Sequence, residues 1–278
     1  MSNYCELTIL TSEGTIREQL IAQLAEIGYD GFEESDTTLK AYIIEPHFSD
    51  IKLDNLFNKY SITYSKSIIY KQNWNVLWES NFEPVHVDDF VGIRAGFHPP
   101  LQNVAHEIVI TPKMSFGTGH HATTYTVMQM MRELDCTGKS VFDFGTGTGI
   151  LAILAEKLGA TSIVAVDNDD WCIENALENI SINNCNHIDI EKVSELIFNQ
   201  KFDIILANIN KNIILNHIHT LREGLISGGQ LLLSGLLVED EKDILTACSL
   251  LGLHHKQTIA RNGWIAAWFY IDSQKFGC

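Results

Sequence analysis

A glycine-rich turn between an apolar strand and an apolar helix constrains this chain more than any other feature. Residues 141–149 read Val-Phe-Asp-Phe-Gly-Thr-Gly-Thr-Gly, and the hydrophobic run 163–166 is followed by Asp167. In doubly wound sheets, ligands bind at the carboxyl ends of the strands, where glycines let the backbone approach a nucleoside and an acid on the next strand holds its ribose. The pattern therefore predicts an α/β fold that binds an adenosine-containing cofactor.

The spacing of the glycines separates two cofactor classes. A dinucleotide fingerprint Gly-x-Gly-x-x-Gly counted from Gly145 requires glycine at position 150, where this chain has Ile150. The form Gly-x-Gly-x-Gly preceded by Asp143 resembles the first motif of the seven-stranded methyltransferases that bind S-adenosylmethionine. Turns of this kind also occur where only tight packing is needed, and Asp167 is what favours a ligand site over that alternative.

The charge balance limits the classes of partner. The chain has 278 residues and a formal net charge of −16. An acidic surface repels phosphate backbones, so we expect no direct nucleic-acid binding. The same charge favours encounter with a basic partner, although an acidic surface also serves solubility alone.

Targeting and redox signals point to the cytoplasm. No apolar run approaches the roughly 20 residues of a membrane span, and the first ten residues lack the pattern of a secretory signal. Six cysteines are scattered without Cys-x-x-Cys spacing, which is typical of reduced thiols. No Cys and His residues lie at metal-ligand spacing, so we expect no metal, and the sequence leaves the oligomeric state open.

Residues 1–72 form a first predicted domain without visible chemistry. The order strand, helix, strand, strand, helix, strand is that of a ferredoxin-like α+β unit, which we interpret as a substrate-recognition domain. The strands are expected at 4–10, 31–35, 39–44 and 62–70, and the helices at 13–27 and 50–60.

A connector and a larger domain follow. Residues 73–100 are rich in aromatic residues and proline, including Trp74 and Trp78, which favours an ordered connector over a flexible one. Residues 101–278 alternate strands and helices and end in a hairpin around Asn262-Gly263. A mostly parallel sheet that ends in an antiparallel hairpin is the architecture of the methyltransferase superfamily. Strands are expected at 106–111, 141–144, 163–166, 202–207, 230–234, 254–260 and 264–271.

Two further segments carry polar groups suited to a ligand. Residues 113–124 combine glycines, threonines and a His120-His121 pair at a strand-to-helix turn, where helix N-terminal amides are free to bind a polar ligand. The strand 202–207 is followed by Asn208, whose side chain both donates and accepts hydrogen bonds. The alternatives are a threonine-capped helix start and an asparagine that caps the helix at 211–222.

These segments together resemble the bacterial methyltransferase family that modifies ribosomal protein L11, and the resemblance covers essentially the whole chain. It implies that Thr124, Gly145, Asp167 and Asn208 bind S-adenosylmethionine, with Asp167 on the ribose and Thr124 and Asn208 beside the methionine portion. It also implies methylation of lysine side chains or the N-terminal amine of L11, with the N-terminal domain recognising that protein. The chain departs from the family pattern at five positions: Thr146, Thr148, His120, Ala122 and Asn210.

The predicted chemistry needs positioning more than a dedicated base. The cofactor carries the reactive methyl group, and the attacking amine must be neutral. At pH 7 about one lysine in 2,500 is neutral, against roughly one N-terminal amine in ten, and burial beside a cation lowers either pKa. We name no catalytic residue, since His120 and His121 are more often structural in such a turn. The alternatives left open are a methyltransferase acting on another macromolecule or a small molecule, a nicotinamide dehydrogenase, and a binding module without activity.

Overall fold

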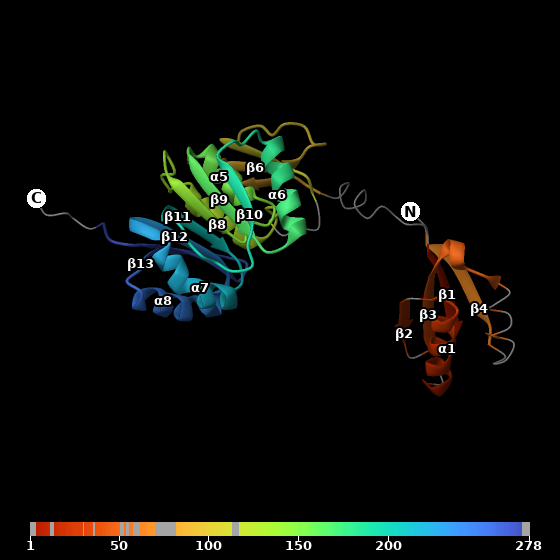
Figure 1. Cartoon of the computed structure of the whole chain (residues 1–278). Coiled ribbons are helices and arrows are strands. Elements are labelled where there is room, and N and C mark those ends of the chain that lie inside the picture. Colours follow the sequence, from red (N-terminus) through yellow and green to blue (C-terminus); the bar gives the residue numbers. More distant parts are fainter. Residues whose placement is uncertain are drawn as a thin grey trace, which may run out of the picture. The chain divides into compact units, whose positions relative to one another are not determined.

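The chain divides into two compact units, Met1–Asn81 and Phe82–Cys278 (Figure 1). The first unit has one hydrophobic core, and the second has two. The structure is a computed structural model that describes residues 4–11, 14–29, 31–35, 37–50, 53, 56–57, 62–69, 82–112 and 117–273. Of the predicted connector, residues 73–81 lie outside the described residues. Residues 82–100 belong to the second unit, so the division at 72 and 100 stays a prediction.

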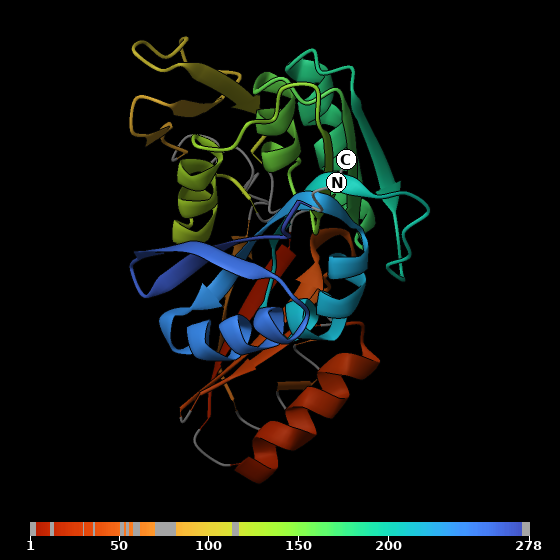
Figure 2. The same ribbon diagram turned by 90° about the vertical axis from the view of Figure 1, so that its left-hand side faces the viewer.

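The N-terminal unit is a four-stranded antiparallel sheet with the strand order β2-β3-β1-β4. The element order strand, helix, strand, strand, strand agrees with the predicted ferredoxin-like unit, whose second predicted helix, 50–60, lies mostly outside the described residues. The helix α1 lies along one face of the sheet (Figure 2), where its Leu20 and Leu24 are fully buried with Leu7 and Ile9 of the central strand. The elements are β1 (Tyr4–Leu10), α1 (Gly14–Glu26), β2 (Gly31–Glu34), β3 (Thr38–Ile44), the 3₁₀ turn η1 (Glu45–His47) and β4 (Tyr64–Ile69).

The second unit contains the predicted seven-stranded sheet, with the order β10-β9-β8-β11-β12-β14-β13. Five strands run parallel, and β14 pairs antiparallel with both β12 and β13, which confirms the terminal hairpin. The strands are β5 (Val85–Val87), β6 (Val91–Ala95), β7 (His106–Ile110), β8 (Ser140–Phe144), β9 (Ser162–Asp167), β10 (Ile188–Lys192), β11 (Phe202–Asn208), β12 (Leu225–Leu237), β13 (His254–Arg261) and β14 (Trp264–Tyr270). The helices are α4 (Ala122–Met131), α5 (Ile150–Lys157), α6 (Asp170–Ile182), α7 (Lys211–Glu223), the 3₁₀ turn η2 (Val238–Asp240) and α8 (Glu241–Leu250).

One strand of the large sheet differs from the prediction. The strand expected at 106–111 is β7, and it pairs with β6 in a separate three-stranded sheet that also contains β5. The seventh strand of the main sheet is β10, which the sequence analysis did not identify. Its residues Ile188–Lys192 read Ile-Asp-Ile-Glu-Lys on an edge of the sheet, and none of them is fully buried. An edge strand of this kind lacks the apolar run that marks a buried parallel strand.

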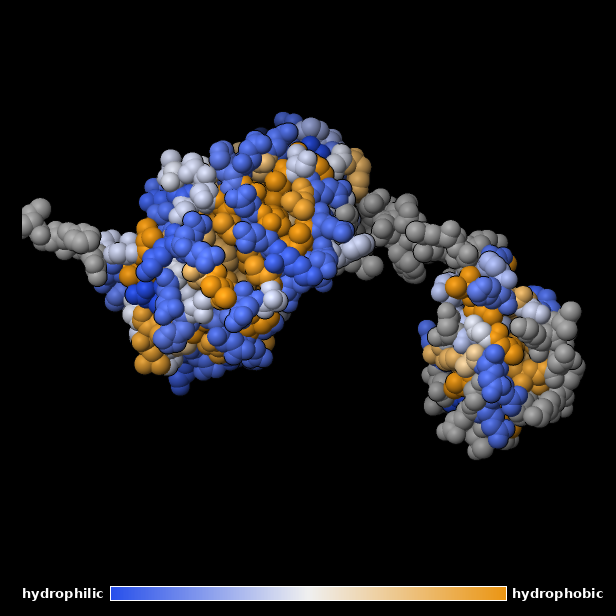
Figure 3. Space-filling model, viewed as in Figure 1, coloured by the Kyte–Doolittle hydropathy of each residue, from blue (hydrophilic) through white to orange (hydrophobic). Residues whose placement is uncertain are grey.

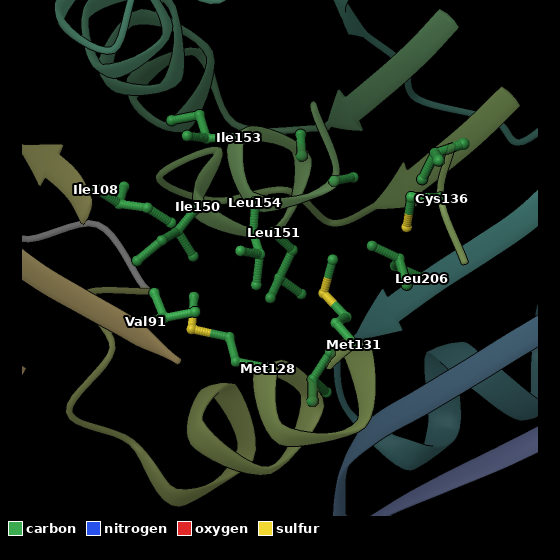
Figure 4. Packing of buried hydrophobic residues seen from close by; sticks show 14 of the residues in the cluster. Val91, Ile108, Met128, Met131, Cys136, Ile150, Leu151, Ile153, Leu154 and Leu206 are labelled. Atoms are coloured by element: carbon green, nitrogen blue, oxygen red, sulfur yellow. The ribbon is translucent and has the colours of Figure 1, made fainter. Parts of the chain in front are cut away.

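Alternate residues of the central strands enter two separate cores. In β8, Val141 packs with the cluster that holds α4 and α5, whereas Phe142 packs with the cluster that holds α7 and α8. Figure 4 shows the first of these cores, in which Met128 and Met131 of α4 face Leu151 and Leu154 of α5. The sheet is therefore covered on both faces, and only its strand ends are free to form a ligand site.

Candidate functional site

The four predicted binding residues line one cavity of about 640 Å³ in the second unit. Gly145 follows β8, Asp167 ends β9, Asn208 ends β11, and Thr124 lies in the first turn of α4. The carboxyl ends of these parallel strands meet at one edge of the sheet, as the strand pattern predicts. A cavity of this volume is within the range that binds a small molecule or cofactor.

The glycines of the turn present backbone atoms directly to the cavity. Gly145 has φ +75° and Gly149 has φ +78°, in the left-handed region that L side chains rarely adopt. A Cβ atom on Gly145 would lie 2.3 Å from Ile209 Cγ2, so no larger residue fits without displacing its neighbour. The hydroxyl groups of the two threonines in the turn fix its conformation by hydrogen bonds to neighbouring residues. Thr146 Oγ1 donates to Asp143 Oδ2 at 2.6 Å, and Thr148 Oγ1 donates to the Gly117 carbonyl oxygen at 2.6 Å.

Asp143 is a fully buried carboxyl group beneath this turn. Burial raises its pKa to about 6, and the nearby Asp167 carboxylate acts in the same direction, while the hydrogen bond from Thr146 opposes the shift. The side chain is 1% exposed and does not line the cavity. Asp143 therefore supports the turn from inside the protein.

Asp167 is held rigidly by backbone amides at the cavity wall. Its Oδ2 accepts a hydrogen bond from the Gly147 N–H at 2.9 Å. Its Oδ1 accepts from the N–H groups of Asn168 at 2.8 Å and Asp169 at 3.2 Å. A carboxylate offers about four lone-pair sites, so it still has capacity for one hydroxyl hydrogen from a ligand.

Thr124 and Asn208 are joined at the other end of the cavity. Asn208 Nδ2 donates to Thr124 Oγ1 at 3.3 Å, which fixes the amide plane. Asn208 Oδ1 is buried and has no hydrogen-bond partner within the described part of the chain. A buried acceptor without a donor is costly by about 1–3 kcal/mol, so this atom is expected to meet a ligand N–H or O–H.

The alternative prediction, that Asn208 caps the helix that follows it, is wrong, because another residue is the cap. Asn210 caps α7, and its Oδ1 accepts from the Ile213 N–H at 3.1 Å. The departure from the family pattern at position 210 is thereby explained as a capping residue that also lines the cavity.

The two histidines of the predicted loop have different surroundings. His121 lines the cavity, caps α4 and lies edge-on to Trp264, with ring centroids 4.8 Å apart. His120 is exposed, and its Nε2 lies 3.1 Å from the Glu83 carbonyl oxygen. Residues 113–116 of that loop lie outside the described residues, so the structure locates only its Gly117–Thr124 part.

Several cavity residues were not identified from the sequence. Trp264 follows the Asn-Gly hairpin signal, which predicted the turn but gave no indication of a ligand site. Cys172 on α6 also lines the cavity, and burial together with Asp167 and Asp169 raises the pKa of its thiol to about 11, so it contributes an uncharged wall. Val193, Ser194, Glu195 and Leu196 follow the unpredicted strand β10.

The residues that the structure describes were predicted to hold neither a metal site nor a membrane span. Among those residues, no group of three or more His, Cys, Asp or Glu side chains is arranged to hold a metal ion. None of the helices within the same ranges is long and apolar enough to cross a membrane.

Comparison with known proteins identifies the family of the chain. The family described as "Ribosomal protein L11 methyltransferase (PrmA)" matches residues 6–270. A ribosomal protein L11 methyltransferase of Porphyromonas gingivalis is 44% identical over 97% of this chain and 94% of its own length. The Chlorobaculum tepidum protein of the same name is 36% identical over 95% of this chain and 96% of its own.

A crystal structure shares the fold. It is described as a ribosomal protein L11 methylase from Lactobacillus delbrueckii subsp. bulgaricus, and it superposes with a TM-score of 0.64 at 29% identity, covering 69% of this chain and all of that chain. The methyltransferase fold and the resemblance that the loop, turn and strand-end residues indicated are confirmed. The chain belongs to the ribosomal protein L11 methyltransferase family.

Proposed function

We propose that this protein transfers methyl groups from S-adenosylmethionine to lysine side chains, the N-terminal amine, or both, of ribosomal protein L11 in the cytoplasm. Family membership supports the substrate, since the relatives are named for it. The observation that carries the chemistry is the unpartnered Oδ1 of Asn208 in the same cavity as the glycine turn and Asp167. A nicotinamide cofactor is disfavoured by Ile150, which occupies the position of the third fingerprint glycine.

The residues of the cavity fit this cofactor. Asp167 has acceptor capacity for a ribose hydroxyl, and the turn at Gly145 lets a ligand touch backbone where a Cβ would block it. Thr124 and Asn208 would bracket the methionine portion from the opposite side. When bound, the cofactor supplies an electrophilic methyl group, and the protein contributes orientation.

Asn208 is suited to orient the attacking amine. A neutral amine must direct its lone pair at the methyl carbon, and an N–H that donates to Asn208 Oδ1 turns the lone pair away from that oxygen. The hydrogen bond from Nδ2 to Thr124 Oγ1 fixes the orientation of the amide. His121 and Trp264 bound the same end of the cavity. We assign none of these residues as a general base, because an amine that is desolvated beside a cation loses its proton to water more easily.

The N-terminal unit is proposed to recognise the protein substrate. One face of its sheet is covered by α1, and the other carries Glu6, whose carboxylate accepts hydrogen bonds from Lys40 and Tyr42, both at 3.1 Å. Residues 1–72 contain eleven acidic and six basic side chains, which suits a basic protein partner. We expect no direct binding of nucleic acid, because the net charge of −16 repels phosphates.

Transfer of a labelled methyl group tests the proposal. Purified protein and labelled S-adenosylmethionine are incubated with ribosomal proteins from cells that lack this enzyme. We expect one labelled band, identified by mass as L11, with label on lysine or the N-terminal residue. Binding of the cofactor without a labelled protein would instead favour a small molecule or another macromolecule as the acceptor.

A further inference from the structure

An apolar rim borders the acceptor end of the cavity. Trp264 lines the cavity and lies edge-on to His121, which caps α4, the helix whose Thr124 is bonded to Asn208. Trp264 therefore lies at the end where the unpartnered Oδ1 is found.

The strand pair β12–β14 continues the rim. Leu237 lies directly opposite Trp264 in the antiparallel register, so both side chains project from the same face of the sheet. Trp264 lines the cavity, and Leu237 is 37% exposed. The next residue, Val238, is 49% exposed and donates its N–H to the Gly263 carbonyl oxygen at 3.0 Å. The acceptor rim thus consists of Leu237, Val238 and Trp264.

The rim is held in place by a polar corner. Asp240 Oδ2 accepts from the Leu237 N–H at 2.9 Å, and Asp240 Oδ1 lies 2.9 Å from Lys211 Nζ. Lys211 also contacts Asp243 at 2.7 Å, so two carboxylates neutralise its charge. These bonds tie the start of α7 to η2 and α8. The turn that carries Leu237 and Val238 is therefore fixed.

The border of the rim is acidic. Residues 239–243 contain four acids and one lysine, and with Lys211 included the charge is −2. Isolated exposed aliphatic residues are ordinary on protein surfaces, and Figure 3 shows hydrophobic residues reaching the surface among hydrophilic ones on the face it views. What sets this rim apart is its continuity with the cavity and with an excess of negative charge.

We infer that the acceptor rim binds the segment of the protein substrate that carries the target amine, and that this segment is basic with an apolar side chain next to the amine. The inference rests on the proposed function. The apolar side chain would cover Leu237 and Val238, while flanking cations would meet Glu239 and Glu241. A second copy of the chain is disfavoured as the occupant, since it carries a net negative charge itself.

Two rim variants and two matched controls test this inference in the full-length protein. The rim variants are Val238→Asp, which removes apolar contact, and Glu239→Lys, which reverses a charge at the border. The controls make the same chemical changes elsewhere: Leu250→Asp at the end of α8, where Leu250 is 81% exposed, and Glu223→Lys at the end of α7. Val238 and Glu239 are both exposed, so we expect the variants to fold. An unchanged Kd for S-adenosylmethionine would show that each variant retains the cavity.

The expected result is a KM for L11 that rises about five- to tenfold in each rim variant and less than twofold in each control. The effect of Glu239→Lys should shrink as salt is raised, whereas that of Val238→Asp should persist. Wild-type KM values in both rim variants would overturn the inference. A change in sedimentation without a change in KM would overturn it too, by showing that a second copy covers the rim.

The activity of the wild-type protein tests the proposed function separately. If the wild type transfers no methyl group to L11, the proposed function is wrong and the rim inference falls with it. If the wild type is active and the rim variants match it, only the rim inference is wrong.

Discussion

The two ends of the cavity are built in opposite ways. At the Asp167 end, the carboxylate already accepts three backbone N–H groups, and the glycine turn is locked by the hydroxyls of Thr146 and Thr148. At the Asn208 end, the amide nitrogen has a partner and the amide oxygen has none. The first end is held in place by the chain itself and keeps one free lone-pair site on Asp167, whereas the second has a buried acceptor without any hydrogen bond.

Under the proposed function, this difference predicts a division between cofactor binding at the Asp167 end and methyl transfer at the Asn208 end. A preformed, fully hydrogen-bonded wall binds a ligand without first paying for its own ordering. The unpartnered oxygen of Asn208 is stabilised only when a donor reaches it. In the proposed reaction this donor is an N–H group of the substrate amine. Substitutions at the two ends should therefore affect different steps of the reaction.

The largest effect is expected for Asp167→Ala. The change removes a ribose acceptor and also releases the N–H groups that hold the turn, and hydrogen bonds to a charged group contribute about 1.5–3 kcal/mol each. We expect the Kd of S-adenosylmethionine, measured by calorimetry, to rise about 100-fold or more. Asp170→Ala is the matched control, because Asp170 is an exposed acid of α6 paired with Lys192 outside the cavity. An unchanged Kd in Asp167→Ala would show that this end is not the nucleoside site.

Asn208→Ala should act mainly on turnover. Loss of Oδ1 removes the group that orients the amine, so we expect kcat for L11 to fall about 10- to 100-fold while the cofactor Kd changes less. Asn212→Ala removes an exposed amide from α7 outside the cavity and should be neutral. A variant in which only the cofactor Kd changes would assign Asn208 to cofactor binding alone and remove the contrast between the two ends.

The buried carboxyl beneath the turn gives a pH-dependent test of the Asp167 end. Burial raises the pKa of Asp143 to about 6 from an ordinary value of 3.8, so the folded protein binds this proton more tightly than the unfolded chain does. Its contribution to stability is fully present below about pH 4 and is lost as the pH rises through 6. Denaturant unfolding should show the free energy of unfolding of the wild type, relative to Asp143→Asn, falling by about 2–3 kcal/mol between pH 4 and pH 7.

Asp203 provides a control in which the pKa shift, and therefore the pH dependence of stability, has the opposite sign. Burial works against ionisation there too, but hydrogen bonds from Ser140 and Lys139 prevail and lower the pKa of that carboxyl. Its contribution is present above the ordinary pKa and is lost as the pH falls. A flat difference curve for Asp143→Asn would mean that Asp143 titrates alike in the folded and unfolded protein.

The smallest effect is expected for Thr124→Val. The hydroxyl that accepts from Asn208 Nδ2 is removed without a change of shape, so Asn208 loses one orienting bond, and we expect a three- to tenfold lower kcat. Thr126→Val is matched to it on the same helix, because the Thr126 hydroxyl donates only to the helix carbonyls of Ala122 and Thr123. Equal activities in the two variants would show that the bond to Thr124 does not position Asn208.

The features that sequence predicts here are those that depend on short stretches of chain. The glycine turn, Asp167 and the strand ending in Asn208 each follow from a buried strand next to a polar terminus, and the cavity contains all three. The short strands β5 and β6 were absorbed into the predicted connector, because three to five residues with a Gly92 inside carry little periodicity. Trp264 reaches the cavity only through the register of β14 on β12, a long-range pairing that no local pattern encodes.

The confinement of the cavity to one unit has an evolutionary consequence. All described residues that line it lie within Phe82–Cys278, while the N-terminal unit has a separate core and sheet. Under the proposed recognition role of the first unit, sequence drift or recombination in the first 81 residues can alter which protein is engaged while leaving the cavity intact. A lineage that exchanged the first unit would then need matching changes only at the acceptor rim to acquire a new target.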